Sequence, residues 1–298
     1  MKNSDQPLVS ILIPCYNSEK FISKVFECIE NQTYKNLEIL LHDDFSQDKT
    51  YEKLVKYRKS SVHTVRLFNS TENIGVVSST NILLENSKGN YIASFGHDDL
   101  IFSDKIETQV NALEQNKDCT LCTHEYDFYD WINKKVIERK VKRGTKLFTK
   151  TNLKKSILSG IATISCMYRN SDLPKVNNLC PNSDTLFYFD LIGPENKIIT
   201  INKKLMYYGR HNNNLTNIKN YENKSMLRDS LIESSILLSK YPNYASIIKK
   251  RISNILRYNR RFFNNDEYVK LLLASISFNK NYKNIGALIL FKFFGIKK

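Results

Sequence analysis

Residues 91–100 read Tyr-Ile-Ala-Ser-Phe-Gly-His-Asp-Asp-Leu, an apolar run that ends in two adjacent carboxylates, Asp98 and Asp99. The run predicts a buried strand over residues 91–95. Two neighbouring acids raise each other's pKa, so we expect a cation beside them. Oxygen ligands suit Mg²⁺ or Mn²⁺. At the carboxyl end of a strand in an α/β chain, such a metal lies where a nucleotide phosphate binds.

Strand and helix patterns alternate four times up to this point. The apolar runs predict strands over 9–13, 37–41, 65–68 and 91–95, and the helical patterns between them cover 19–31, 51–57 and 76–86. This alternation favours an α/β fold, with a mostly parallel sheet flanked by helices.

The second half of the chain is less regular. We expect helices over 104–116 and 147–158, and strands over 120–129, 134–142 and 197–205. From residue 221 onward the pattern is helical. We therefore expect one domain over residues 1–218 and a basic helical C-terminal region over residues 219–298.

The formal charge of +15 is unevenly distributed. Residues 249–298 carry 12 basic residues against Asp266 and Glu267. Apolar and aromatic residues are interleaved with these cations, and residues 285–296 add an apolar stretch, a pattern typical of in-plane attachment to an anionic membrane. A solvated basic face is the alternative. No nucleic-acid-binding module is recognisable, so no nucleic-acid partner is expected.

Export and membrane-spanning signals are absent from the sequence. The N-terminus does not resemble a signal peptide, and no apolar run approaches the roughly 20 residues that span a bilayer. We expect a cytoplasmic protein, peripheral on the inner face of the cell membrane, with reduced cysteines. The lone Cys119-Thr-Leu-Cys122 motif is interpreted as buried thiols rather than a zinc site.

The carboxyl ends of parallel strands gather at one edge of a sheet, where ligands bind. That edge would hold residues 14–17, Asp43 with Asp44, residues 73–75, and Asp98 with Asp99. No glycine-rich phosphate loop is present. A bound diphosphate would need another source of positive charge, and a metal on Asp98 and Asp99 supplies it.

Four motifs in order carry a family resemblance: Val9-Ser-Ile-Leu-Ile-Pro-Cys-Tyr-Asn17, Asp43-Asp-Phe-Ser-Gln-Asp-Lys-Thr50, Glu72-Asn-Ile-Gly75, and the strand that leads into Asp98-Asp99. Together they resemble the family 2 glycosyltransferases. The resemblance implies a GT-A (Rossmann-like) fold and an inverting, metal-dependent transfer of a hexosyl or N-acetylhexosaminyl group from a nucleotide diphosphate.

The resemblance also implies roles for single residues. Tyr16 corresponds to the aromatic side chain that packs on the base, and Asp44 to the carboxylate that reads the base's N–H. The nucleotide pocket would further be lined by Pro14, Glu19, Asn73 and Gly75.

The acidic motif departs from the family pattern. Many members have an acid at the position of Gly96. The family places one acid of the pair near the ribose and the other on the metal, so both Asp98 and Asp99 stay candidate metal ligands. His97 is a possible further ligand, although we interpret it as space-filling.

By the same resemblance, the general base that deprotonates the acceptor hydroxyl opens a later helix. Asp184 lies at that place, with Asp190 as the alternative, and Ser183 replaces the usual Glu. Further on, residues 208–216 resemble the segment that closes over the donor, in which Arg210 or His211 would contact the diphosphate.

Simpler interpretations stay open for the acids, because Asp is a preferred N-cap residue and Asp44, Asp98 and Asp184 each precede a predicted helix. The function we expect is transfer from a UDP-sugar to a growing, polyprenyl-linked bacterial surface glycan such as lipopolysaccharide or capsule. The alternatives are a nucleotidyl-type transferase, or a non-catalytic membrane or nucleic-acid binding protein with the same fold.

Overall fold

The structure is a computed structural model. It describes residues 6–140, 146–171, 173–176, 180, 184–212, 214, 225–258, 266, 268–270 and 273.

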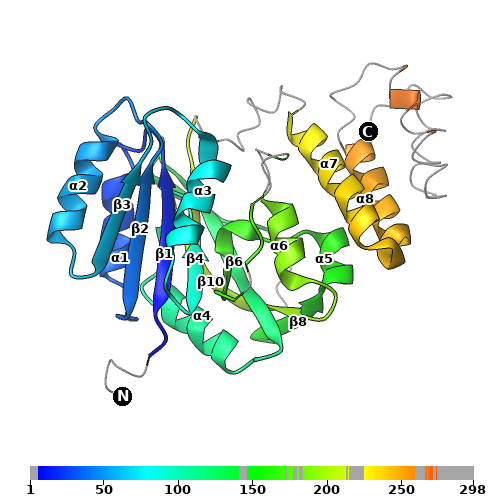
Figure 1. Cartoon of the computed structure of the whole chain (residues 1–298), viewed down its shortest axis with the longest axis horizontal. Coiled ribbons are helices and arrows are strands. Elements are labelled where there is room, and N and C mark those ends of the chain that lie inside the picture. The colour runs from blue at the N-terminus through cyan, green and yellow to red at the C-terminus, as the bar shows by residue number, and fades with distance from the viewer. Residues whose placement is uncertain are drawn as a thin grey trace. The chain divides into compact units, whose positions relative to one another are not determined.

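The N-terminal half alternates strands and helices, as predicted (Figure 1). The elements are β1 (Val9–Cys15), α1 (Ile22–Glu30), β2 (Leu37–Asp43), α2 (Thr50–Ser60), β3 (Thr64–Asn69), α3 (Gly75–Asn86) and β4 (Tyr91–Ser94). The four strands are parallel in the order β3-β2-β1-β4, so their carboxyl ends lie at one edge. β1 and β2 are buried almost throughout, which explains their continuous apolar character.

The second half extends the same sheet with mixed pairing. Its elements are β5 (Leu100–Ile101), α4 (Lys105–Glu114), β6 (Cys119–Asp130), β7 (Lys135–Ile137), β8 (Phe148–Asn152), α5 (Leu153–Ser159), β9 (Met167–Arg169), α6 (Thr185–Ile192) and β10 (Lys197–Arg210). The order continues β4-β9-β6-β10-β5, with β9 antiparallel to β4 and β6, and β10 parallel to β6. The predicted α/β class with a mostly parallel sheet is confirmed.

The prediction of a helix over residues 147–158 is partly wrong. Residues 148–152 form β8, which pairs antiparallel with residues 197–201 of β10, and only residues 153–159 are helical. Two β-branched threonines, Thr149 and Thr151, suit a strand. The partner strand supplies the hydrogen bonds that decide the conformation, and periodicity within the segment does not reveal that partner.

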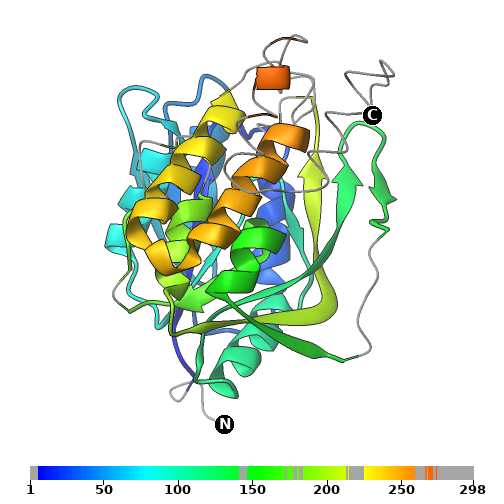
Figure 2. The same cartoon turned by 90° about the vertical axis from the view of Figure 1, so that its right-hand side faces the viewer.

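The chain divides into two compact units, one of Met1–Leu153 with Ile161–Asn217 and one of Lys154–Gly160 with Ile218–Lys298. In the second, α7 (Ser225–Lys240) and α8 (Ala245–Tyr258) lie side by side (Figure 2). Arg251 of α8 turns inward to Glu233 of α7, with Nη2 3.4 Å from Oε2. This cation is therefore engaged by a buried acid, whereas Lys250 is exposed.

Apart from residues 266, 268–270 and 273, the expected basic region after residue 258, including residues 259–265 and 285–296, lies outside the described residues. Among the helices in the described ranges, none is both long enough and apolar enough to cross a membrane.

Candidate functional site

The carboxyl ends of β1, β2 and β4 meet at one edge, as predicted. The backbone N–H of Asp44 donates to the carbonyl of Cys15 at 2.9 Å, and Nδ1 of His97 lies 3.3 Å from the carbonyl oxygen of Pro14. These contacts join the segments that follow three different strands, so the candidate residues of the edge lie together.

Asp44 connects the edge to α3. Its Oδ1 accepts the N–H of Ile74 at 2.8 Å, and its Oδ2 accepts the N–H of Gly75 at 2.9 Å. Gly75 has a φ of +84°, a conformation that favours glycine. The carboxylate is buried and sits at the start of a helix, where negative charge is favourable. In this structure Asp44 therefore holds the turn that contains Asn73.

Two loops at the edge are tied to each other. The backbone N–H of Lys49 donates to Oε2 of Glu19 at 3.3 Å, and the N–H of Gln47 donates to Oδ1 of Asn17 at 2.8 Å. In the same two loops, Tyr16 and Phe45 are 43% and 45% exposed. Two aromatic residues near Asp44 are thus partly open to solvent.

Asp99 is fully buried, and both of its oxygens accept backbone hydrogen bonds. Oδ2 accepts the N–H of Gly96 at 2.8 Å, and Oδ1 accepts the N–H of Gly209 at 3.0 Å. Burial, and then the charge of Asp98, raise the pKa of Asp99 well above its usual range. Asp99 therefore fastens the turn after β4 to β10.

Asp98 has a different environment. Its Oδ2 lies 3.2 Å from Nε2 of His211 and accepts a hydrogen bond from Nδ2 of Asn214 at 2.9 Å. Burial opposes ionisation of Asp98, but the hydrogen bond from His211 and the neighbouring His97 hold its pKa below the usual range. The edge thus contains one carboxylate that stays ionised and a second that resists ionisation.

An aromatic wall covers the Asp98–His211 pair. Phe21 stacks on His211 with ring centroids 4.4 Å apart, and its centroid is 5.1 Å from that of Trp131. Nε1 of Trp131 donates to the carbonyl of Asp98 at 2.8 Å. Sequence reasoning missed Phe21, Trp131 and Asn214. Contacts between such distant segments leave no local pattern in the sequence. The single tryptophan of the chain was the one signal that could have pointed to this part of the site.

Two glycines permit this packing. A Cβ on Gly209 would overlap the carbonyl oxygen of Asp98, and a Cβ on Gly96 would lie 2.7 Å from Oδ1 of Asp98. Many family members have an acid at the position of Gly96. With Asp98 and Asp99 placed as they are in this structure, a side chain at that position would have no room.

Most of the residues described at this edge belong to a region that matches a known protein family. Residues 10–176 match the family described as Glycosyl transferase family 2, which covers more than half of the chain. The chain belongs to glycosyl transferase family 2. The resemblance seen in the four sequence motifs is confirmed.

Curated relatives match less than half of this family 2 chain. An uncharacterized glycosyltransferase of Haemophilus influenzae is 38% identical over 128 residues, 42% of this chain and 50% of the relative. The Escherichia coli UDP-Glc:alpha-D-GlcNAc-diphosphoundecaprenol beta-1,3-glucosyltransferase WfgD is 32% identical over 129 residues, 43% of this chain and 48% of that protein. The matched region is about half the length of these relatives.

Solved structures share the fold over most of the chain. Crystal structures of S. aureus TarS 1-349 superpose with a TM-score of 0.68 for the UDP complex and 0.69 for the UDP-GlcNAc complex, each covering 94% of this chain and 83% of that one. Their identities of 16% and 14% support the GT-A fold alone.

The family's remaining positions lie on other elements. Asp184 is exposed immediately before α6, and after burial and Cys166 its charge is the next cause that raises the pKa of Tyr168 on β9. Asp190 lies within α6 and is half-buried. The guanidinium of Arg210 lies over the ring of Phe128 at 4.8 Å. Ser183 and residues 215–216 lie outside the described residues.

Within the described ranges, no group of three or more His, Cys, Asp and Glu side chains is placed to hold a metal. At the family's acidic motif Asp98 offers carboxylate oxygens, and Nε2 of His211 is directed at Oδ2 of that carboxylate, 3.2 Å away. Magnesium commonly takes only one or two protein carboxylates and completes its shell with phosphates and water. The residues present therefore fit a cation that is shared with a bound diphosphate.

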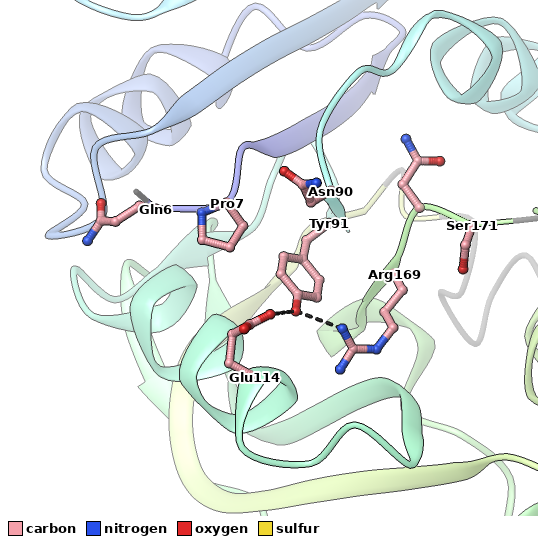
Figure 3. A pocket seen from close by; sticks show the side chains of 8 residues that line it. Gln6, Pro7, Asn90, Tyr91, Glu114, Arg169 and Ser171 are labelled. Atoms are coloured by element: carbon pink, nitrogen blue, oxygen red, sulfur yellow. Dashed lines mark hydrogen bonds between the residues drawn. The ribbon is translucent and has the colours of Figure 1, made fainter. Parts of the chain in front are cut away.

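A pocket of about 440 Å³ lies at the opposite edge of the glycosyltransferase sheet (Figure 3). Tyr91, the first residue of β4, donates its hydroxyl to Glu114 and accepts Nη1 of Arg169 at 2.8 Å. Nη2 of Arg169 donates to the carbonyl of Leu113 at 2.7 Å. These groups satisfy one another, so we interpret this network as a structural tie between β4, α4 and β9.

Proposed function

We propose that this protein is an inverting glycosyltransferase that moves a hexosyl or N-acetylhexosaminyl group from a UDP-sugar to a hydroxyl of a growing surface glycan. Family membership supports glycosyl transfer. The observation that carries the proposal is the buried carboxylate of Asp98, 3.2 Å from Nε2 of His211, in the segment that follows the carboxyl end of β4. This is the sheet edge where α/β folds bind nucleotides.

The donor and acceptor follow from chemistry and from similar proteins. The E. coli relative is named for a UDP-glucose donor and a diphosphoundecaprenol-linked acceptor, and the TarS structures hold UDP or UDP-GlcNAc. We extend both ideas to this chain as a UDP-sugar donor and a polyprenyl-linked acceptor, with the enzyme peripheral on the cytoplasmic face of the membrane.

The nucleotide would lie over the exposed rings at the edge. Tyr16, which is partly exposed, would stack on the base, while Pro14, Glu19, Asp44, Asn73 and Gly75 would line the pocket. Since both oxygens of Asp44 already accept backbone N–H groups, its contribution to base recognition would use their remaining lone pairs.

A divalent cation, Mn²⁺ or Mg²⁺, would be held by the Asp98 carboxylate, which His211 supports by its hydrogen bond. When bound, it would neutralise the charge that develops on the departing diphosphate. Asp99 is the weaker candidate ligand, because its oxygens accept two backbone N–H groups and its pKa is raised. Arg210 would add positive charge beside the diphosphate.

In the transfer, the acceptor oxygen forms a bond to the anomeric carbon while the bond from that carbon to the diphosphate oxygen breaks. UDP leaves with the bonding electron pair, and the hydroxyl proton passes to a base. We assign the base to Asp184, which is exposed at the start of α6, with Asp190 as the alternative.

The test is turnover of a panel of UDP-sugars with Mn²⁺, together with calorimetric titration of UDP. Asp98→Asn should abolish metal-dependent UDP binding with little change in thermal stability. Asp99→Asn should instead lower stability, because an amide nitrogen would face a backbone N–H. Glu85→Gln, an exposed change on α3, is the control.

Full metal-dependent binding and turnover by Asp98→Asn would reject the proposed site. Release of pyrophosphate in place of UDP would point to a nucleotidyl transferase.

A further inference from the structure

The hairpin of β6 and β7 presents apolar side chains to solvent beside the candidate site. Ile132, Val136 and Ile137 are 59%, 43% and 42% exposed. β7 pairs with β6 and lies off the main path of the sheet. In Figure 2 this green hairpin stands at one side of the sheet, with its turn on the side where β10 ends.

The turn is built to hold these side chains outward. Oδ1 of Asp130 accepts the N–H groups of Ile132 and Asn133 at 2.9 and 3.0 Å, and Oδ2 accepts Nδ2 of Asn133 at 2.7 Å. Lys134 has a φ of +50°. Such an Asx-type turn fixes the backbone locally, so the exposure of Ile132 is part of the fold.

The charges around the apolar residues are mainly positive. Lys134, Lys135 and Lys140 are exposed within the same segment. Two acids belong to the same hairpin: Asp130, whose oxygens accept the hydrogen bonds of the turn, and Glu138, whose Oε1 lies 4.0 Å from Nζ of Lys204. Exposed aliphatic side chains among lysines match the interface of an anionic bilayer, where the former enter the acyl boundary and the latter meet lipid phosphates.

The hairpin is also fixed to the catalytic edge. The N–H of Trp131 donates to the carbonyl of Arg210 at 2.9 Å, and its Nε1 donates to the carbonyl of Asp98. A surface that received Ile132 would therefore lie next to Asp98.

We propose that the tip of this hairpin, residues 131–140, docks on an anionic lipid surface and thereby places the catalytic edge at the membrane. This rests on the proposed function, because a lipid-linked acceptor presents its sugar at that surface. It differs from attachment through the C-terminal region, which the sequence pattern suggested.

Trp131 is the only tryptophan of the chain, so its fluorescence reports on this hairpin alone. The full-length chain is mixed with vesicles of equal parts phosphatidylglycerol and phosphatidylcholine, without donor or acceptor. Because the indole packs against Phe21 next to Ile132, we expect quenching of its emission by brominated acyl chains, and loss of this quenching at high salt. Pure phosphatidylcholine vesicles should have little effect.

Variants separate the contributions of charge and apolar contact. Lys134→Gln with Lys135→Gln should weaken vesicle binding by about 25-fold, since each lysine near an anionic surface contributes about fivefold. Ile132→Ser with Ile137→Ser should remove the quenching. Lys59→Gln with Val62→Ser is the matched control, because these exposed residues precede β3 at the opposite edge of the sheet. Circular dichroism checks that each variant is folded.

Three results would overturn the proposal: no sedimentation with anionic vesicles, sedimentation with unchanged Trp131 emission, or hairpin variants that bind as tightly as the control. The second would assign attachment to another part of the chain. Absence of sugar transfer with vesicle binding intact would reject the proposed enzyme function and leave this inference standing.

Discussion

Nε2 of His211 lies 3.2 Å from Oδ2 of Asp98, and this buried pair joins the segment after β10 to the segment after β4. Phe21 stacks on the imidazole and Asn214 shares the same carboxylate oxygen. The acidic motif is therefore completed by residues from the far end of the first unit. This arrangement has consequences for binding, stability and pH dependence.

Replacing His211 should weaken donor binding and change its acid limit. We expect His211→Ala to lower Mn²⁺-dependent UDP affinity by about 10- to 100-fold, as for lost metal ligands or their supports. Burial would then act on Asp98 without its main opposing hydrogen bond, so the pKa of Asp98 would rise. Metal-dependent UDP binding requires ionised Asp98, which is present only above that pKa. As the pH is lowered, binding should therefore be lost at a higher pH in His211→Ala than in the wild type.

Calorimetric titration of UDP across acidic pH checks this prediction. His211→Gln, which retains a side-chain hydrogen-bond donor, should recover part of the affinity. Identical acid limits in wild type and His211→Ala would contradict the assigned pair.

Gly209→Ala should be more harmful than its size suggests. The added methyl group would overlap the backbone carbonyl of Asp98, which cannot move without shifting the whole turn. We expect a loss of about 1–3 kcal/mol in the free energy of unfolding, together with weaker UDP binding. Gly96→Ala meets a carboxylate side chain that can rotate, so it should cost less stability while still disturbing Asp98. Urea denaturation of both variants measures the difference, and equal losses would argue against this geometry.

Asp44 should matter for the fold as well as for nucleotide binding. Asp44→Ala leaves the N–H groups of Ile74 and Gly75 without their acceptor and should lower the free energy of unfolding by about 1–3 kcal/mol. Asp44→Asn keeps one acceptor oxygen and should lose less. Denaturant unfolding without any nucleotide tests this, because a residue that only reads the base would leave apo stability unchanged.

Lys105 gives a second pH-dependent prediction. It is fully buried, its Nζ donates to Oε1 of Gln109 at 2.6 Å, and burial lowers its pKa to about 8. An unfolded lysine titrates near 10.4. Between these values the unfolded chain binds more protons than the folded one, so the burial penalty is relieved as the pH rises and stability increases.

Lys105→Met removes this group, so the stability of the wild type should rise relative to the variant by about 2–3 kcal/mol between pH 8 and pH 10. Parallel urea titrations of both proteins cancel the effects of tyrosines and thiols, which are common to them. A constant difference across this range would mean that Lys105 keeps an ordinary pKa.

Much of the edge could be predicted because the relevant information is local. Each strand of the first half is an apolar run followed by its own polar motif, and parallel pairing brings residues 14–17, Asp44 and Asp98 to one side. The roles of Asp44 and Asp99 could not be predicted in this way. Whether a carboxylate faces a ligand or accepts backbone N–H groups depends on which segment packs over it.

The second half was harder for the same reason. β8 lies in a segment that the sequence predicted to be helical, and its partner β10 decides its conformation. Trp131 and Asn214 reach Asp98 from the segments that follow β6 and β10, which are neighbouring parallel strands although about 80 residues apart in the sequence. The hydrophobic periodicity of the sequence does not predict such contacts, because they depend on how distant segments are connected across the sheet rather than on neighbouring residues.

The amino-acid sequence alone determined the alternation of strands and helices, the family and the edge at which its acids gather, since apolar periodicity and short motifs act over a few residues. Only the tertiary structure decided which acid stays ionised. Asp98 and Asp99 are chemically identical neighbours, and their difference arises because His211 and Asn214 reach one of them while backbone amides enclose the other.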